Sequence, residues 1–227
     1  MLQQTQVKRV LKFYAEFMRH FPTAKKLAAA PLSEVLKSWQ GLGYNRRAKM
    51  LHMASTRLNL VKRVVYSELV ELPGVGSYTA KAIAAFAYNQ DVIFVETNIR
   101  TAVIHHFFTK KKKVSDKEIE KILIQALPKG KAREWYSALM DYGAYLKQSG
   151  ISHNARTKKY VKQSKFTGSL REARGAILRA LAVKPYQSFA LINLFGSDRC
   201  AQTQKALGAL EKEGLVQKTG KRYTLAD

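Results

Sequence analysis

The stretch LPGVGS at residues 72–77 places two glycines one residue apart, directly before a run of small residues that is typical of a helix. Gly74 and Gly76 can adopt backbone conformations closed to other residues, and they carry no side chain that would keep a ligand away. A helix beginning at Ser77 would offer the positive end of its dipole and its unpaired N–H groups to an anion. The residues predicted in this way to bind a backbone phosphate, without reading base sequence, are Leu72, Pro73, Gly74, Val75, Gly76 and Ser77. A plain connection between two helices is the alternative interpretation.

The charge of the chain also indicates an anionic partner. The 227 residues include 40 Lys and Arg against 16 Asp and Glu, which gives a formal net charge of +24. Such an excess opposes a compact fold unless a polyanion neutralises it, and nucleic acid does so with release of its counterions. An anionic membrane surface would suit the charge as well, but no terminal helix is both strongly basic and amphipathic.

Composition excludes several classes of protein. The sequence contains no run of 18 apolar residues, so no transmembrane helix is predicted. The opening MLQQTQVKRV has no secretory signal. The single cysteine, Cys200, excludes a disulfide framework and an intrachain cysteine-based metal cluster, and a cytosolic compartment fits. The pair His105-His106 has no cysteine or carboxylate at metal-ligand spacing, so no metal site is predicted.

Apolar residues at helical spacing predict a mainly α-helical chain. Pro31 is suited to the first position of a helix, Asn45 and Ser77 to N-caps, and SDKE at 115–118 to a capping box. The helices predicted in this way cover residues 3–19, 26–29, 32–39, 45–60, 67–72, a segment from 77 onward, 98–108, 115–127 and 133–147.

The composition changes after about residue 147, and three regions are predicted: a helical domain over 1–150, a basic linker over 151–167, and a small domain over 168–227. The small domain shows three helical stretches followed by a hairpin around Thr219-Gly220, the outline of a winged helix. Its candidate groove-reading residues are Gln202, Gln204 and Lys205, and its candidate backbone contacts are Lys218, Lys221 and Arg222. A module that docks protein or only packs is the alternative.

Three motifs together resemble one family. LPGVGSYTAKAI is similar to the helix-hairpin-helix of the base-excision DNA glycosylases, and MLQQTQV with GLGYNRRAKML narrows the resemblance to the A/G-specific adenine glycosylases. The order and spacing of the motifs match that family through about residue 146. The resemblance implies a two-lobed helical fold with a catalytic cleft, in which an adenine flipped out of the duplex is cut from its sugar.

The resemblance also implies roles for single residues. Gln4 matches a glutamine that fills the gap left by the flipped base, and Tyr44 matches an aromatic residue beside the orphan base; a surface glutamine and a core tyrosine are the alternatives. Tyr78 stands where lyase-active relatives carry a lysine that forms a Schiff base, so a monofunctional glycosylase is implied. Lys81, one turn further on, is expected to contact a phosphate.

Glu96 is the expected catalytic carboxylate. It stands in FVETNIRT where the family has an aspartate, and a carboxylate there would stabilise the positive charge that develops on the sugar. Its side chain is one methylene longer, and an acid near a helix N-terminus is the alternative role. Asn98 is expected to orient this carboxylate or the attacking water.

The resemblance implies a general acid, a glutamate just upstream of MLQQTQV, that protonates the leaving adenine. The chain begins at Met1 of that motif, so two explanations compete. Either the sequence starts too late, which a helix predicted almost from residue 1 favours, or the acid has been lost.

The four-cysteine iron–sulfur loop of the family would follow MDYGA at 140–144, but no cysteine occurs there, so no cluster is expected. Arg156, Lys158 and Lys159 are basic residues that could hold the DNA backbone in its place. No other cofactor is expected, although a monovalent cation on carbonyl groups of the hairpin is compatible with the resemblance. The segment from 168 replaces the family's domain that reads 8-oxoguanine.

The resulting hypothesis is a monofunctional DNA glycosylase that removes adenine opposite 8-oxoguanine or G. A thymine or uracil mismatch glycosylase is one alternative, and a non-catalytic protein that binds mismatches or lesions is the other. The expected partner is double-stranded DNA with a mismatch or an oxidised base, and no membrane partner is expected. The chain is expected to act as a monomer in the cytoplasm, or in the nucleoid of a prokaryote.

Overall fold

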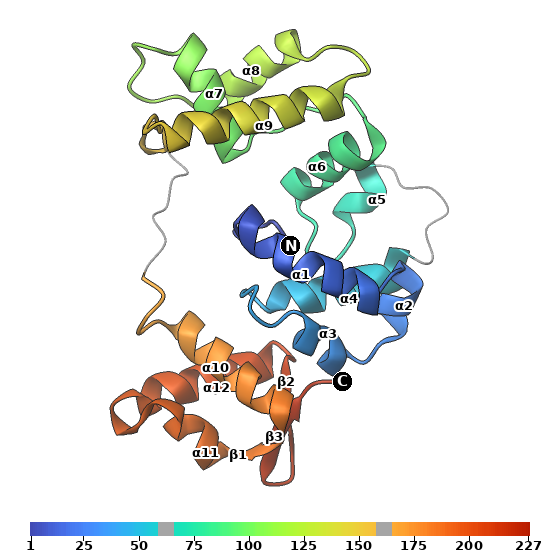
Figure 1. Ribbon diagram of the computed structural model, residues 1–227, viewed down its shortest axis with the longest axis vertical. Coiled ribbons are helices and arrows are strands. Elements are labelled where there is room, and N and C mark those ends of the chain that lie inside the picture. The colour runs from blue at the N-terminus through green and yellow to red at the C-terminus, as the bar shows by residue number, and fades with distance from the viewer. Residues whose placement is uncertain (59–65, 158–164) are drawn as a thin grey trace. The chain divides into compact units, whose positions relative to one another are not determined.

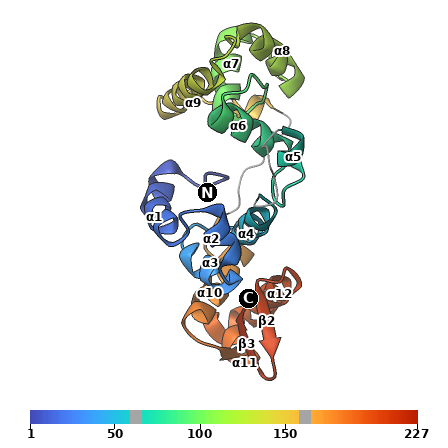
Figure 2. The same ribbon diagram turned by 90° about the vertical axis from the view of Figure 1, so that its right-hand side faces the viewer.

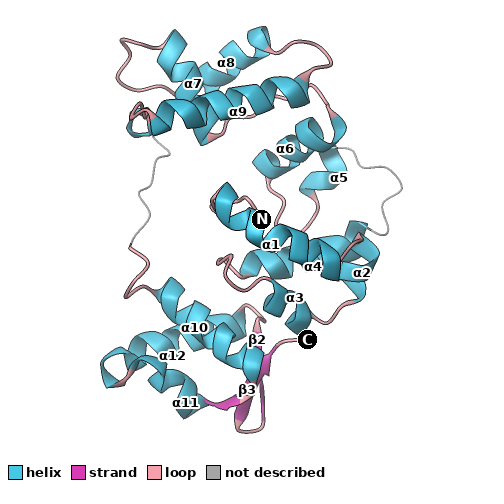
Figure 3. Ribbon diagram, in the orientation of Figure 1, coloured by secondary structure: helices cyan, strands magenta, loops and turns pink. Residues whose placement is uncertain are grey.

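The computed structural model describes residues 1–58, 66–157 and 165–227. These residues are mainly helical, with one small antiparallel sheet (Figure 3). They fall into two compact units: residues 1–58, 72–74 and 165–227 form the first unit, and residues 66–71 and 75–157 form the second. None of the described helices is long and apolar enough to span a lipid bilayer.

The first unit joins the two ends of the sequence. Its N-terminal helices are α1 (Val7–His20), α2 (Ala24–Ala29), α3 (Leu32–Ser38) and α4 (Arg46–Leu58) (Figure 1). Its C-terminal part holds α10 (Leu170–Val183), β1 (Tyr186–Gln187), α11 (Ser188–Ile192), α12 (Cys200–Lys212), β2 (Val216–Thr219) and β3 (Arg222–Leu225). Helix α3 packs against α10 and β3, so Leu36 and Trp39 share one core with Ile177 and Leu210.

The compact units therefore cut the chain differently from the expected division into 1–150, 151–167 and 168–227. The physical reason is that α3 buries its apolar face against the C-terminal part of the chain. Polar contacts support this packing, because Gln40 donates to the carbonyl of Leu178 at 3.1 Å and Lys49 donates to the carbonyl of Glu213 at 2.6 Å.

The C-terminal part has a winged-helix-like arrangement. Strand β3 lies between β1 and β2, antiparallel to both, with Tyr186 opposite Tyr223 and Val216 opposite Leu225. The β2–β3 turn contains Gly220 at φ 61°. The sequence predicted the helices and this hairpin, but it did not reveal β1, because two residues give no periodic signal.

The second unit contains α5 (Tyr66–Val70), α6 (Ser77–Tyr88), α7 (Thr97–Phe107), α8 (Asp116–Ala126), α9 (Ala132–Gln148) and the short 3-10 helix η1 (Asn154–Arg156). Helices α7 and α9 lie side by side in both views (Figures 1 and 2), around a core that includes Ile99, Ile119 and Tyr136. The predicted capping box at the start of α8 is confirmed, since Ser115 and Glu118 bond each other's backbone N–H groups.

One predicted helix start and two predicted cap positions are wrong. Helix α1 begins at Val7 rather than residue 3, because Gln4 has a left-handed backbone with φ 56°. Pro31 is the N-cap of α3 and not its first residue. Gly76 is the N-cap of α6, while Ser77 lies inside the helix with its hydroxyl 3.2 Å from that of Tyr66.

Candidate functional site

A half-buried carboxylate lies at the N-terminus of α7. Glu96 is the N-cap residue, and its Oε2 accepts a hydrogen bond of 2.7 Å from the backbone N–H of Asn98. The hydroxyl of Thr97 donates to Oε1. Because glutamate is not among the residues that N-cap positions favour, capping alone does not account for its presence here. The two contacts fix a negative charge at the positive end of the α7 dipole.

Tyr78 lies close enough to Glu96 for the two to interact electrostatically. It projects from the first turn of α6, remains 43% exposed, and packs edge-on against Phe94 with 5.8 Å between ring centroids. Burial raises the pKa of the Tyr78 hydroxyl, and the charge of Glu96 acts in the same direction. The hydroxyl therefore stays protonated at neutral pH. The second unit thus brings together two residues that the sequence analysis assigned to catalysis.

Asn98 is oriented by a residue that the sequence analysis missed. Its side-chain carbonyl Oδ1 accepts a hydrogen bond of 2.6 Å from Nζ of Lys147 on α9. The contact of Asn98 with the Glu96 carboxylate comes from its backbone N–H. Burial lowers the pKa of Lys147 and Arg100 acts in the same direction, while Glu96 opposes them.

Gly143 lets α9 approach α7 closely. A Cβ atom at this position would lie 2.1 Å from the backbone oxygen of Asn98 and 2.5 Å from its carbonyl carbon. Real Cβ atoms essentially never approach other atoms so closely, so only glycine fits this position. The glycine in MDYGA was visible in the sequence, but nothing there showed which backbone it faces.

The predicted hairpin glycines differ in conformation. Gly74 has φ +76°, and a Cβ there would meet Cβ of Met50 at 2.5 Å. Gly76 adopts φ −82°, which any residue can adopt, and a Cβ would meet open space. No side chain caps α6, so a ligand can reach its first N–H groups. The anion site predicted at this helix start stays a prediction, as do the roles of Leu72, Val75 and Lys81.

A single arginine in the first unit holds the segment around Gln4 and the loop of Tyr44. Both residues are exposed and have positive φ values, 56° and 47°. The guanidinium of Arg47 lies 5.5 Å from the ring centroid of Tyr44. Its acceptors are the carbonyls of Met1, Gln3, Leu42 and Gly43 and the hydroxyl of Thr5. Arg47 therefore ties the segment that carries Gln4 to the loop that carries Tyr44.

Replacing Arg47 by lysine is expected to destabilise the first unit by about 2 kcal/mol, because an ammonium cannot reach five acceptors in a planar arrangement. Thermal unfolding should show a midpoint lower by roughly 4–8 °C. Arg46→Lys is the matched control, since Arg46 is an exposed neighbour on the same helix. An equal effect of the two substitutions would contradict this account of Arg47.

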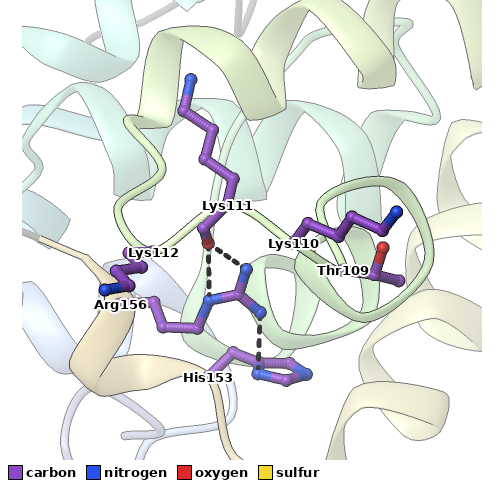
Figure 4. A pocket seen from close by; sticks show the side chains of 6 residues that line it. All are labelled: Thr109, Lys110, Lys111, Lys112, His153 and Arg156. Atoms are coloured by element: carbon purple, nitrogen blue, oxygen red, sulfur yellow. Dashed lines mark hydrogen bonds between the residues drawn. The ribbon is translucent and has the colours of Figure 1, made fainter.

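Arg156 braces a loop. Its guanidinium donates to the carbonyls of Phe108 and Lys111, and it lies 3.3 Å from Nδ1 of His153 (Figure 4). Lys111, His153 and Arg156 border an open hollow of about 420 Å³ that Thr109, Lys110 and Lys112 also line. Because backbone carbonyls already occupy the guanidinium, a phosphate contact by Arg156 stays a prediction. Lys158 and Lys159 lie outside the described residues.

The hairpin of the C-terminal part exposes all three residues predicted to contact the DNA backbone: Lys218, Lys221 and Arg222. Gln204 and Lys205 on α12 are exposed as well. Gln202 instead makes internal contacts, since its amide donates to the carbonyl of Gly168 at 2.7 Å and accepts from Arg199. Because its amide already has two internal partners, the groove-reading role of Gln202 stays a prediction.

Comparisons with known proteins agree with the motifs. The model of the HhH-GPD superfamily base excision DNA repair proteins matches residues 1–129. The adenine DNA glycosylase of Mycolicibacterium smegmatis is 32% identical over all of this chain and 85% of its own length. The chain belongs to the HhH-GPD superfamily of base excision DNA repair proteins, and the resemblance inferred from the motifs is confirmed.

Other relatives match in part. The adenine DNA glycosylase of Mycobacterium tuberculosis (strain H37Rv) is 47% identical over 45% of this chain. The matched region is only 35% of the length of that protein. A solved thermostable thymine-DNA glycosylase has a TM-score of 0.56 and 26% identity, over 63% of this chain and 69% of its own. An endonuclease III trapped covalently on DNA, with a TM-score of 0.51 and 24% identity over 63% of this chain and 67% of its own, supports the fold alone.

The iron–sulfur cluster of the resembled family does not fit this chain. Its one cysteine, Cys200, lies in α12 of the first unit, so four thiolate ligands are not available. Within the described ranges, no three His, Cys, Asp or Glu residues are placed to hold a metal ion.

Proposed function

We propose that this chain is a monofunctional DNA glycosylase that hydrolyses the N-glycosidic bond of an adenine mispaired with 8-oxoguanine or G. The observation that carries the proposal is the Glu96 carboxylate, held at the N-terminus of α7 by two hydrogen bonds, in a chain similar to adenine DNA glycosylases. Its partner is double-stranded DNA, which it binds as a monomer.

The chemistry follows from the charge of Glu96. As the base departs, positive charge develops on the sugar, and a carboxylate already fixed by two hydrogen bonds stabilises it without reorganisation. The positive end of the α7 dipole lies at this carboxylate and interacts favourably with its charge. Tyr78 stays a neutral phenol, so it can line the site but cannot form the Schiff base that strand cleavage requires.

The basic surface supplies DNA affinity without base specificity. With a net charge of +24, the chain should bind duplex DNA with a steep dependence on salt. Gly74 and the uncapped start of α6 are the proposed phosphate site, and Gln4 and Tyr44 are the proposed contacts with the bases around the flipped nucleotide. Lys221 and Arg222 of the hairpin are proposed to contact the DNA backbone.

The test is single-turnover base release from four duplexes, containing A opposite 8-oxoguanine, A opposite G, T opposite G and U opposite G. Glu96→Gln serves as the control, and strand breaks are measured before and after alkali. Release of adenine alone, with breaks only after alkali, is expected. Release of T or U would support a mismatch glycosylase of that type. Tight binding of the adenine duplexes without release of any base would support a non-catalytic lesion-binding protein.

Replacing Tyr78 by lysine is expected to create strand-cleaving activity. The amine would lie near Glu96, and this carboxylate could abstract the proton that elimination requires once the amine has formed a Schiff base with the sugar aldehyde. Borohydride should then trap a covalent complex with abasic DNA that the wild-type chain does not form. Tyr78→Phe is the matched control, and trapping in neither variant would place residue 78 away from the sugar.

A further inference from the structure

Two residues on one face of α9 enclose the first turn of α7. Gly143 and Lys147 are four residues apart, so they lie on the same side of the helix. Gly143 faces the backbone oxygen of Asn98, and Lys147 reaches the side chain of the same residue. Asn98 is therefore held at its backbone and at its side chain by one helix.

The contact with Lys147 determines which way the Asn98 amide points. A lysine ammonium can only donate hydrogen bonds, so the atom 2.6 Å from it must be the carbonyl oxygen Oδ1 and not the amide nitrogen. In the part of the chain that the structure describes, no group accepts a hydrogen bond from Nδ2 of Asn98. Asn98, two residues from Glu96, therefore has two side-chain N–H donors left for a ligand, while its oxygen accepts the bond from Lys147.

This orientation suits a nucleic-acid ligand. The sugar and phosphate groups that flank a flipped nucleotide present oxygen atoms that accept hydrogen bonds. A reversed amide would turn its own carbonyl oxygen toward those oxygens, and the two would repel each other.

Arg100, the other cation near Lys147, does not compete with it for the Asn98 side chain. It is buried on α7, and its guanidinium makes hydrogen bonds of 3.0 and 2.9 Å with Oδ1 of Asp116. Its charge is therefore compensated within the second unit. Lys147 is thus the cation available to Asn98 and Glu96 among the residues whose placement is described.

We propose that Lys147 is a positioning residue, whose ammonium fixes the Asn98 amide so that its N–H groups bind an oxygen of the DNA beside Glu96. The inference rests on the proposed function and adds to it. It makes Asn98 a hydrogen-bond donor toward DNA, with its amide oriented by a lysine on another helix.

The test compares Lys147→Met, which removes the ammonium and keeps a long side chain, with Lys147→Arg, which keeps charge and donors. Lys121→Met is the matched control, because it removes the same charge from an exposed position on α8 of the same unit. The measurements are the single-turnover rate on the duplex with A opposite 8-oxoguanine, the affinity for that duplex, and the NMR signal of the Asn98 side-chain amide. That signal is identified by its loss in Asn98→Asp.

We expect Lys147→Met to shift the Asn98 signal and to slow base release about tenfold to a hundredfold, the size of effect that a displacement of about 1 Å produces. Lys147→Arg should recover most of the rate, and Lys121→Met should change neither the signal nor the rate. Since both Met variants lose one charge, a difference between them cannot come from net charge.

Three results would overturn the inference. The first is an equal rate for Lys147→Met and Lys121→Met, and the second is an arginine variant as slow as the methionine variant. The third is a borohydride-trapped DNA adduct of the wild-type chain that Lys147→Met abolishes, since Lys147 would then be a nucleophile. If the wild-type chain releases no base, the proposed function fails. The Asn98 signal and the loss of duplex affinity in Lys147→Met, relative to Lys121→Met, then decide the inference on their own.

Discussion

Base release by the Glu96→Gln variant is expected to fall by about a hundredfold to a thousandfold, because the variant loses the negative charge that stabilises the cationic sugar. The substitution is close to isosteric. Its side-chain carbonyl can still accept the 2.7 Å hydrogen bond from the N–H of Asn98, so α7 keeps an N-cap. Single-turnover kinetics on the duplex with A opposite 8-oxoguanine measure the loss.

The same variant tests whether Glu96 is only a structural cap. The helix dipole interacts with a charged cap by about 0.3–1 kcal/mol, so the unfolding midpoint should fall by no more than roughly 4 °C. A large fall in stability with an unchanged rate would contradict the catalytic role. Glu96→Asp separates charge from reach, because aspartate is a favoured N-cap residue with a shorter side chain.

Gly143→Ala is expected to impair both folding and catalysis. The added Cβ would lie 2.1 Å from the backbone oxygen of Asn98, and neither partner is a flexible side chain that could move aside. Helices α7 and α9 must separate, at a cost of about 1–3 kcal/mol. A separation of about 1 Å would displace Glu96 and Asn98 and slow base release on the order of a hundredfold. Thermal unfolding and single-turnover rates measure the two effects.

Gly208→Ala is the matched control for this substitution. Gly208 also lies inside a helix, α12, but a Cβ there would meet no atom within 4 Å. Because alanine favours helix more than glycine does, the control should stabilise the chain by about 1 kcal/mol. The two substitutions therefore predict shifts of opposite sign in the unfolding midpoint. Shifts of the same sign would contradict the close contact between α7 and α9.

Much of the fold was predictable because its signals are local. The capping box of Ser115 and Glu118, the hairpin turn at Gly220 and the helical periodicity each depend on residues a few positions apart. The class of protein was predictable from three motifs. The start of α1 at Val7 was not, since the segment that carries Gln4 is held by Arg47, far along the chain.

The supporting residues of the site could not be predicted, because their roles depend on tertiary contacts. Lys147 was one basic residue among 40, and Arg47 was one of two adjacent arginines. The sequence suggested that Asn98 acts on Glu96, and it does so through its backbone N–H, while its side chain bonds to Lys147. Only the packing of α9 on α7 could reveal the contact between Lys147 and Asn98.

The shared core of the first unit has a consequence for synthesis on the ribosome. Helices α1 to α4 emerge early, but Leu36 and Trp39 find their partners Ile177 and Leu210 only when the final segment has been translated. The second unit is nearly continuous in sequence and can fold in the meantime. The nascent chain therefore carries exposed apolar helices through most of its synthesis, which is when aggregation or a chaperone competes with folding.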